Sequence, residues 1–192
     1  VRRFVHQYGN VQETSELSRQ ILSYLSSISK SIAAHKLWKE DAADFRPSLE
    51  SWLYGHVRPH IDKVLWTKEA QTSDREWQNR LGSLQFVTAQ HLDVSCLVDC
   101  DAADVLREPI SFLRSLSKYH SPYDMLQCIL RMYHDINAAL KQAMNRNGGD
   151  KLPSADDVLP AIILTILKAQ PDRLLKSLSF VEEFSPAEYV RG

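Results

Sequence analysis

Along most of the chain, apolar residues recur at every third or fourth position, which is the spacing of one face of an α-helix. The clearest stripe follows Thr14 and Ser15, either of which can cap the start of a helix. Its apolar members are Leu17, Ile21, Leu25, Ile28 and Ile32. The pattern predicts an amphipathic helix of roughly 20 residues whose apolar stripe packs against other helices.

The same spacing predicts further helices, separated by turns or short polar links. They are expected over Phe45–Leu65, Asp74–Leu84, Asp101–Tyr119, Pro122–Leu140, Ala155–Lys168 and Asp172–Phe184. Pro59 should kink the first of these or split it in two, because proline cannot donate the hydrogen bond of a helix interior. Pro109 similarly marks a kink in the expected helix Asp101–Tyr119 or a later start of that helix. The polar stretch Thr67–Ser73 is expected to be a link, and Asn145–Asp150 is the clearest loop.

These elements predict an all-α fold, a layered helical bundle in which an N-terminal helical bundle packs on a second helical domain. The composition agrees, because only 6 of the 192 residues are glycine, which disfavours a β-sandwich or barrel with many tight turns. A hydrophobic content of 44% suffices for a sizeable core. The 23 basic and 24 acidic residues nearly cancel, so no nucleic-acid partner is expected.

Membrane-span and cysteine patterns also restrict the class of protein that this sequence can encode. No apolar run approaches the roughly 20 residues of a membrane span, so no transmembrane segment is predicted. Three cysteines cannot all pair within one chain, which is typical of a reducing compartment such as the cytoplasm. The missing initiator methionine indicates an excised fragment.

The candidate chemical groups do not form a catalytic motif. His56 and His60 are four residues apart, but Pro59 disturbs the helix face that they would share. Cys96 and Cys100 alone are too few ligands for a zinc site. No glycine-rich loop has the Lys-Ser/Thr continuation that binds phosphates. The sequence therefore predicts no covalent enzyme chemistry, no metal and no cofactor.

One short segment departs from ordinary helix patterning. Asp156 and Asp157 open an otherwise apolar helix after Ser154, and Pro160 follows within two turns. Ser154 and Asp157 fit a capping box, and both acids face the positive end of the helix dipole. Capping needs only one acid, however, and it does not explain Pro160, which costs roughly 3 kcal/mol in a regular helix. A functional role and a capping role for the acid pair therefore both stay open.

The residues around this pair resemble the Vps-nine (vacuolar protein sorting nine) domain family. Ala155–Pro160 is similar to the family's A-D-D-(F/L)-(L/V)-P motif, and Leu167–Pro171 is similar to its L-K-A-N-P motif. Ser121–Arg131 and Leu81–Leu92 resemble two earlier family segments, so the likeness covers about residues 45–192. It implies an N-terminal helical bundle and linker over residues 1–100 and a Vps-nine-type exchange domain over residues 101–192, incomplete at its C-terminus.

The resemblance implies guanine-nucleotide exchange on small GTPases of the Rab-five subfamily, GDP-bound or nucleotide-free, without covalent chemistry. By its motif, Asp156 corresponds to the acidic finger that enters the lysine and magnesium site of the GTPase, and Pro160 to a proline that shapes the binding surface. Asp157, Val158 and Leu159 are further candidates for partner contact, although Val158 and Leu159 also suit the core. The family further implies a cytoplasmic protein recruited to early endosomes, with adaptors bound through flanking regions.

The sequence differs from the family pattern at a few positions. Val158 stands where Phe or Leu is usual, and Gln170 stands where Asn is usual. A family motif that contains a further tyrosine, G-E-x-x-Y-Y, would begin at about Tyr189–Gly192. Two hypotheses remain, an active exchange factor and a non-catalytic helical scaffold that binds a GTPase or another endosomal protein.

Overall fold

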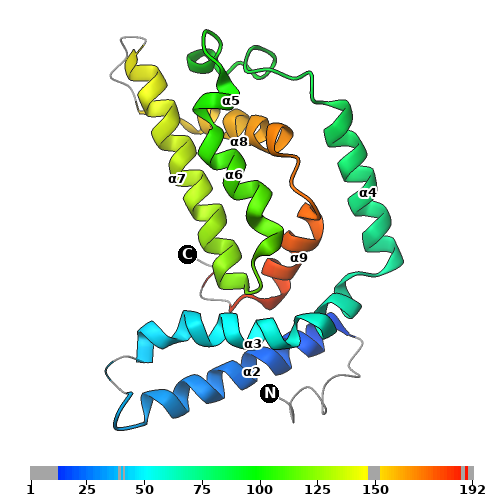
Figure 1. Cartoon of the computed structure of the whole chain (residues 1–192), viewed down its shortest axis with the longest axis vertical. Coiled ribbons are helices and arrows are strands. Elements are labelled where there is room, and N and C mark those ends of the chain that lie inside the picture. Colours follow the sequence, from blue (N-terminus) through cyan, green and yellow to red (C-terminus); the bar gives the residue numbers. More distant parts are fainter. Residues whose placement is uncertain (1–12, 39, 41, 147–151, 187–188, 190–192) are drawn as a thin grey trace. The chain divides into compact units, whose positions relative to one another are not determined.

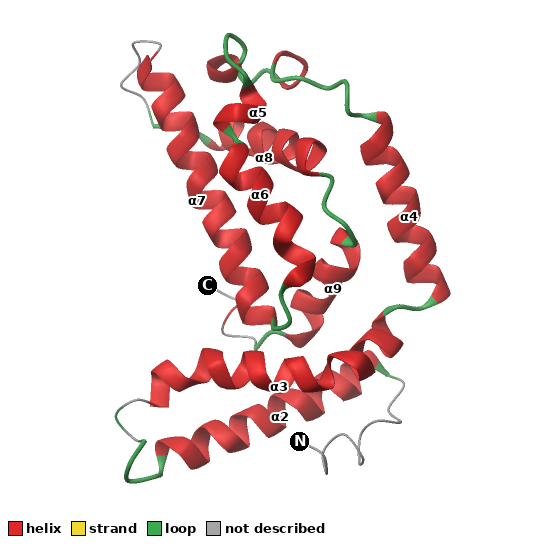
Figure 2. Ribbon diagram, in the orientation of Figure 1, coloured by secondary structure: helices red, strands yellow, loops and turns green. Residues whose placement is uncertain are grey.

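The computed structural model describes residues 13–38, 40, 42–146, 152–186 and 189. Within these residues every regular element is a helix and none is a strand (Figure 2). The α-helices are α2 (Thr14–Ala33), α3 (Ala42–Leu65), α4 (Lys68–Ser83), α5 (Ala102–Val105), α6 (Arg107–Ser115), α7 (Pro122–Arg146), α8 (Ala155–Ala169) and α9 (Leu174–Phe184). Three short 3₁₀ turns are η1 (Gln90–Leu92), η2 (Ser95–Leu97) and η3 (Leu116–Lys118). The all-α prediction is confirmed.

The chain forms two compact units, each assembled from separate segments. The first comprises Val1–Ser73, Tyr119–Leu126 and Leu175–Gly192, and the second comprises Asp74–Lys118 and Gln127–Leu174. The first unit thus holds α2, α3 and most of α9, and the second holds α5, α6, α8 and most of α7. The domain boundary expected at residue 100 stays a prediction.

In the first unit, α2 packs along α3 (Figure 1). The predicted stripe on α2 is buried at Leu17, Ile21 and Leu25, as the helical spacing requires. Tyr54 of α3 is fully buried, and its hydroxyl donates to the Phe184 carbonyl of α9 at 2.7 Å. Burial raises the pKa of Tyr54, so this hydroxyl stays protonated and serves as a donor.

The two expectations for the chain around α3 need correction. The helix runs unbroken through Pro59, so the predicted split in two is wrong, whereas the alternative of a kink at Pro59 stays a prediction. Proline removes the donor to the Gly55 carbonyl, but Gly55 and Pro59 are both exposed and water can satisfy that carbonyl. The expected polar link Thr67–Ser73 is also wrong, because α4 already begins at Lys68.

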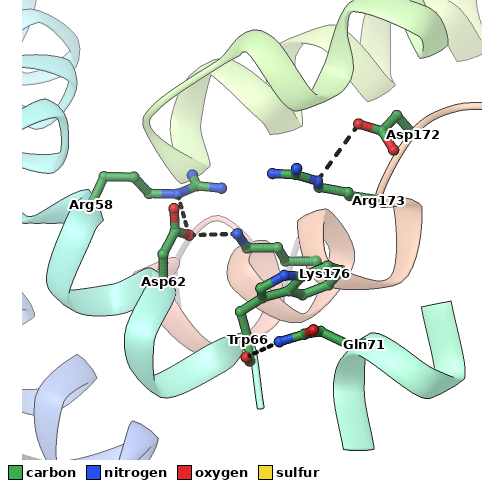
Figure 3. A network of polar contacts seen from close by, with 7 residues as sticks. All are labelled: Arg58, Asp62, Trp66, Gln71, Asp172, Arg173 and Lys176. Carbon is green, nitrogen blue, oxygen red and sulfur yellow. Dashed lines mark hydrogen bonds and ion pairs between the residues drawn. The ribbon is translucent and has the colours of Figure 1, made fainter. Parts of the chain in front are cut away.

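The start of α4 is stabilised by polar groups rather than by an apolar stripe. The Ala70 N–H donates to the Thr67 hydroxyl at 3.2 Å, which satisfies one of the free donors of the first turn. The Gln71 side-chain amide donates to the Trp66 carbonyl at 3.0 Å (Figure 3). A search for apolar periodicity cannot detect a helix that begins in this way.

The second unit has a core in which α6 packs against α8. Leu106, Ile110 and Leu113 are buried around α6, and the inner face of α8 is buried as well. A neighbouring cluster joins Leu81, Val87 and Leu167. Pro109 lies in the first turn of α6, where the helix needs no N–H from it, so the predicted later start is confirmed.

Candidate functional site

The N-terminus of α8 is closed by one of the two predicted acids. Ser154 and Asp157 form the capping box that the sequence predicts. The Ser154 N–H donates to Asp157 Oδ2 at 2.8 Å, and the Ser154 hydroxyl donates to the same oxygen at 2.6 Å. These two hydrogen bonds lower the pKa of Asp157 below its usual range. Asp157 is therefore ionised at neutral pH and its carboxylate is engaged within the helix end.

The other acid is left for solvent or a partner. Asp156 is exposed, and its carboxylate forms no hydrogen bond or ion pair with any other described residue. It lies in the first turn of α8, where unsatisfied N–H groups and the helix dipole favour negative charge. The structure thus places an exposed negative group at a helix start, without a polar partner among the described residues, while its neighbour Asp157 supplies the cap.

An apolar strip continues from Asp156 along the same side of α8. Leu159 is 61% exposed and Ile163 is 40% exposed. These residues follow Asp156 by three and seven positions, so the three side chains share one helix face. We call Asp156, Leu159 and Ile163 the α8 outer face. A carboxylate beside exposed aliphatic groups is suited to a partner that combines a cation with an apolar surface.

The opposite side of α8 belongs to the core of the second unit. Its buried residues include Val158, Ala161, Leu164 and Thr165. Pro160 lies between the two sides and is partly buried, and α8 continues through it without a break. Because Pro160 lacks an N–H, the Asp156 carbonyl loses its usual donor four residues on. The main chain that carries the exposed acid is therefore held by one helix bond fewer.

The predicted site residues consequently face different ways. Asp156 and Leu159 point outward, Asp157 binds the cap, Pro160 is partly buried and Val158 is in the core. Both Val158 and Leu159 were also candidates for the core. Val158 is in the core, at 6% exposed, and Leu159 is not. The assignment of these residues to partner binding stays a prediction.

The C-terminus of α8 is fixed by groups that the sequence reasoning missed. Arg114 of α6 donates from Nε to the Ala169 carbonyl at 3.2 Å and from Nη2 to the Lys168 carbonyl at 3.1 Å. Gln170 ends the helix in the left-handed conformation, with φ 47°, and donates to the Leu81 carbonyl at 3.3 Å. The positive charge of Arg114 also interacts favourably with the negative end of the helix dipole at this C-terminus. These contacts hold the far end of α8 in place within the second unit.

Other candidate groups do not assemble into a site in the described part of the chain. No three His, Cys, Asp or Glu side chains there are placed to hold a metal ion. The cysteines at 96, 100 and 128 are free thiols, and burial is the main cause that raises the pKa of Cys96. No described helix is both long and apolar enough to cross a bilayer.

Replacing Asp157 by alanine should destabilise the protein by about 1 kcal/mol, because α8 loses its reciprocal cap. The pKa of Asp157 is depressed in the folded state. Its contribution is therefore present above the unfolded pKa of about 3.9 and is lost as pH falls through the lower folded value. Urea denaturation at neutral and acidic pH measures this difference, which should shrink in acid. A variant as stable as the parent at neutral pH would show that the cap is dispensable.

The helices that form and flank this site match a known domain. Residues 107–192 match the family model of the vacuolar sorting protein 9 (VPS9) domain. This segment spans α6 to α9 and includes the whole of the acid-bearing helix. The resemblance noted from the sequence is confirmed over this segment, which matches the VPS9 domain.

Curated relatives extend the similarity beyond this segment. Vacuolar protein sorting-associated protein 9A of Arabidopsis thaliana is 22% identical over 188 residues, which is 96% of this chain and 36% of the relative. Rab5 GDP/GTP exchange factor of Mus musculus is 29% identical over 142 residues, 71% of this chain and 28% of the relative. GTPase-activating protein and VPS9 domain-containing protein 1 of Homo sapiens is 36% identical over 74 residues, 38% of this chain and 5% of the relative. The chain thus spans little more than a third of the first of these relatives and less of the others.

Proposed function

We propose that this chain is a guanine-nucleotide exchange factor for Rab GTPases of the Rab-five subfamily, with Asp156 as an acidic finger. One observation carries the proposal: the Asp156 carboxylate is exposed and unengaged by other described residues at the start of α8, inside a VPS9 domain. The similarity to Rab5 GDP/GTP exchange factors of mouse and human supports the class of partner.

The proposed mechanism needs only electrostatics. A small GTPase holds its nucleotide chiefly through a P-loop lysine and a Mg²⁺ ion on the phosphates. A carboxylate that enters this site pairs with the lysine, repels the β-phosphate and disfavours the Mg²⁺ position. No bond is made or broken, so the protein acts as a regulator and not as a covalent catalyst. Asp156 suits this role because no ion pair with another described residue has to be broken first.

The exposed aliphatic groups of the α8 outer face supply contact area beside the charge. Leu159 and Ile163 are the residues that would meet the apolar part of the GTPase surface. Exchange requires that the factor bind the nucleotide-free GTPase more tightly than the loaded one, and this coupling is reciprocal. Rebinding of nucleotide therefore expels the factor. A 10⁴-fold acceleration of release corresponds to about 5.5 kcal/mol of selective stabilisation.

We place this activity at the cytoplasmic face of early endosomes, where the Rab-five partner implied by the resemblance would be met. Segments outside this chain would supply any endosomal adaptor contacts. This assignment is supported by the match of residues 107–192 to the VPS9 domain and by the similarity to exchange factors.

The test is the release of a fluorescent GDP analogue from a panel of purified Rab proteins in the presence of the chain. We expect faster release from Rab-five-subfamily members, an increase of the rate with chain concentration, and tighter binding of the nucleotide-free form. Equal affinity for the loaded and empty GTPase, with no acceleration, would instead indicate a binding scaffold. No interaction with any Rab protein of the panel would overturn both hypotheses.

A further inference from the structure

An exposed apolar cluster lies where α2 connects to α3, at the lower left of Figure 1. Leu37 is 78% exposed, Trp38 is 46% exposed and Phe45 is 37% exposed. The rings of Trp38 and Phe45 meet edge to face, with centroids 5.0 Å apart. We call Leu37, Trp38 and Phe45 the hairpin tip.

The hairpin tip is ordered by local contacts although it faces solvent. The Leu37 N–H donates to His35 Nδ1 at 3.3 Å, and the Trp38 N–H donates to the His35 carbonyl at 3.1 Å. The apolar stripe of α2 is buried earlier in the helix, at Leu17, Ile21 and Leu25, so the core does not need the tip residues. An ordered apolar group that the fold does not bury calls for an external partner.

The charges around the hairpin tip nearly cancel, and Arg46 is paired with Glu50 at 3.4 Å, so the exposed apolar groups and not the net charge suit a lipid surface. Lys30 and Lys36 are exposed on the approach to Leu37. Between Lys30 and Arg46 the sequence has four basic residues (at 30, 36, 39 and 46) and three acidic residues (at 40, 41 and 44), a net charge of +1. Lysine can extend its charge into a headgroup layer while its stem stays apolar, and tryptophan prefers the same interface.

We propose that the hairpin tip docks on a lipid bilayer, with Leu37 and Trp38 entering the boundary between headgroups and acyl chains. A second copy of the chain fits this surface less well than a bilayer, because the exposed area of the hairpin tip is too small for a stable dimer interface. An aromatic side chain has about 150–250 Å² in all, and a stable dimer buries about 800 Å² per partner. Three partly exposed side chains stay well below that value. A deformable bilayer has no such minimum, and it accepts a projecting Leu-Trp pair flanked by lysines.

This inference goes beyond the proposed exchange activity and does not depend on it. The hairpin tip belongs to the first unit, whereas the acid-bearing helix belongs to the second. Loss of lipid binding and loss of exchange can therefore be observed separately.

The test is sedimentation of the chain with vesicles of phosphatidylcholine containing about 30% phosphatidylserine, and with pure phosphatidylcholine vesicles. Two variants are compared with the parent chain. The first is the double substitution Leu37→Ser with Trp38→Ser, and the second is the matched control Leu152→Ser, whose leucine is 74% exposed. We expect the double variant to bind about tenfold or more weakly and the control to bind as the parent does. Binding to pure phosphatidylcholine should persist at a reduced level, because the net charge of the segment is small.

Tryptophan fluorescence gives a second measurement that does not depend on the loss of binding. The emission of the parent should shift to shorter wavelength on vesicles, and Trp38→Phe should remove most of that shift while it keeps most of the binding. No vesicle binding by the folded parent would overturn the proposal. Equal binding by the double variant and the parent would also overturn it, because the attraction would then be charge alone. A double variant that keeps vesicle binding and loses GTPase binding would identify the tip as a protein contact instead.

Discussion

Replacing Asp156 by alanine is expected to slow stimulated GDP release by about 100-fold or more, equivalent to about 2.7 kcal/mol of lost stabilisation. The carboxylate is the charged group of the α8 outer face and forms no hydrogen bond or ion pair with another described residue. Its removal should therefore subtract only the interaction made with the GTPase. Stopped-flow measurement of fluorescent GDP release with a Rab-five-subfamily protein gives the rate.

The control for this change is another exposed acid in the first turn of a helix in the same unit. Glu108 occupies that position in α6. Glu108→Ala should leave the exchange rate within about twofold of the parent, and both variants should unfold within about 0.5 kcal/mol of it. Unchanged exchange by Asp156→Ala would remove the acidic-finger role. A large loss of stability in that variant would return Asp156 to a structural role at the helix end.

Two conservative substitutions separate charge from shape. Asp156→Asn keeps the size of the side chain and removes its charge, so the attraction to a P-loop lysine should be lost. Asp156→Glu keeps the charge on a longer stem, so release should be faster than with the asparagine variant and slower than with the parent. An asparagine variant as active as the parent would show that the charge is not what promotes release.

The strongly periodic parts of the fold could be predicted from the sequence because their burial follows the helical repeat. The first helix starts at Thr14 and ends at Ala33, as its stripe indicated, but Glu13 and not Thr14 or Ser15 stands at the N-cap position. Helix α7 also begins at Pro122, as predicted, and the Asp124 N–H donates to the Ser121 hydroxyl at 3.1 Å in its first turn. The expected loop over Asn145–Asp150 lies mostly outside the described residues, and α7 itself extends to Arg146.

The failures have physical causes that the apolar pattern does not contain. The segment that includes Thr67 and Gln71 is polar, yet side-chain hydrogen bonds and good helix formers make it the start of α4. Pro59 does not interrupt α3, because the carbonyl that it leaves without a donor belongs to an exposed residue. The first case depends on side-chain hydrogen bonds and the second on where water reaches the backbone, and a periodicity argument includes neither.

The residues of the site could be predicted from the sequence. Which of them caps the helix, which faces the core and which faces solvent could not. The capping box of Ser154 and Asp157 follows from residue types and spacing alone. That Asp156 has no polar partner among the described residues, and that Val158 faces inward while Leu159 faces outward, depends on how α8 sits against α6. The Arg114 contact with the end of α8 joins residues more than 50 positions apart, so no local sequence pattern predicts it.

The second large effect is expected at an ion cluster in the first unit (Figure 3). Asp62 Oδ1 accepts from Arg58 Nε at 3.0 Å and pairs with Lys176 Nζ at 2.8 Å. The Lys176 side chain is only 5% exposed, and its Nζ lies 4.9 Å from the centroid of the Trp66 ring. The Arg58 guanidinium lies over the Phe180 ring at 4.1 Å. One carboxylate thus compensates two cations that join α3 to α9.

Replacing Asp62 by alanine is expected to destabilise the protein by about 2–3 kcal/mol, because it leaves Lys176 buried without its counter-charge. The value lies at the low end for a broken buried pair, since the Asp62 side chain is 38% exposed and water screens part of the interaction. The midpoint of urea denaturation measures the change. Lys176→Met, which removes the charge and keeps an apolar stem of similar length, should cost less than about 1 kcal/mol.

A double-mutant cycle distinguishes a stranded charge from a simple loss of contacts. Adding Lys176→Met to Asp62→Ala should restore part of the lost stability, because no buried ammonium then lacks a partner. The matched control is Asp172→Ala, which breaks the exposed pair with Arg173 at 3.6 Å and should change stability by less than about 0.5 kcal/mol. If Asp62→Ala costs no more than this control, or if the double variant is less stable than Asp62→Ala alone, the charge of Lys176 is not what makes Asp62 necessary.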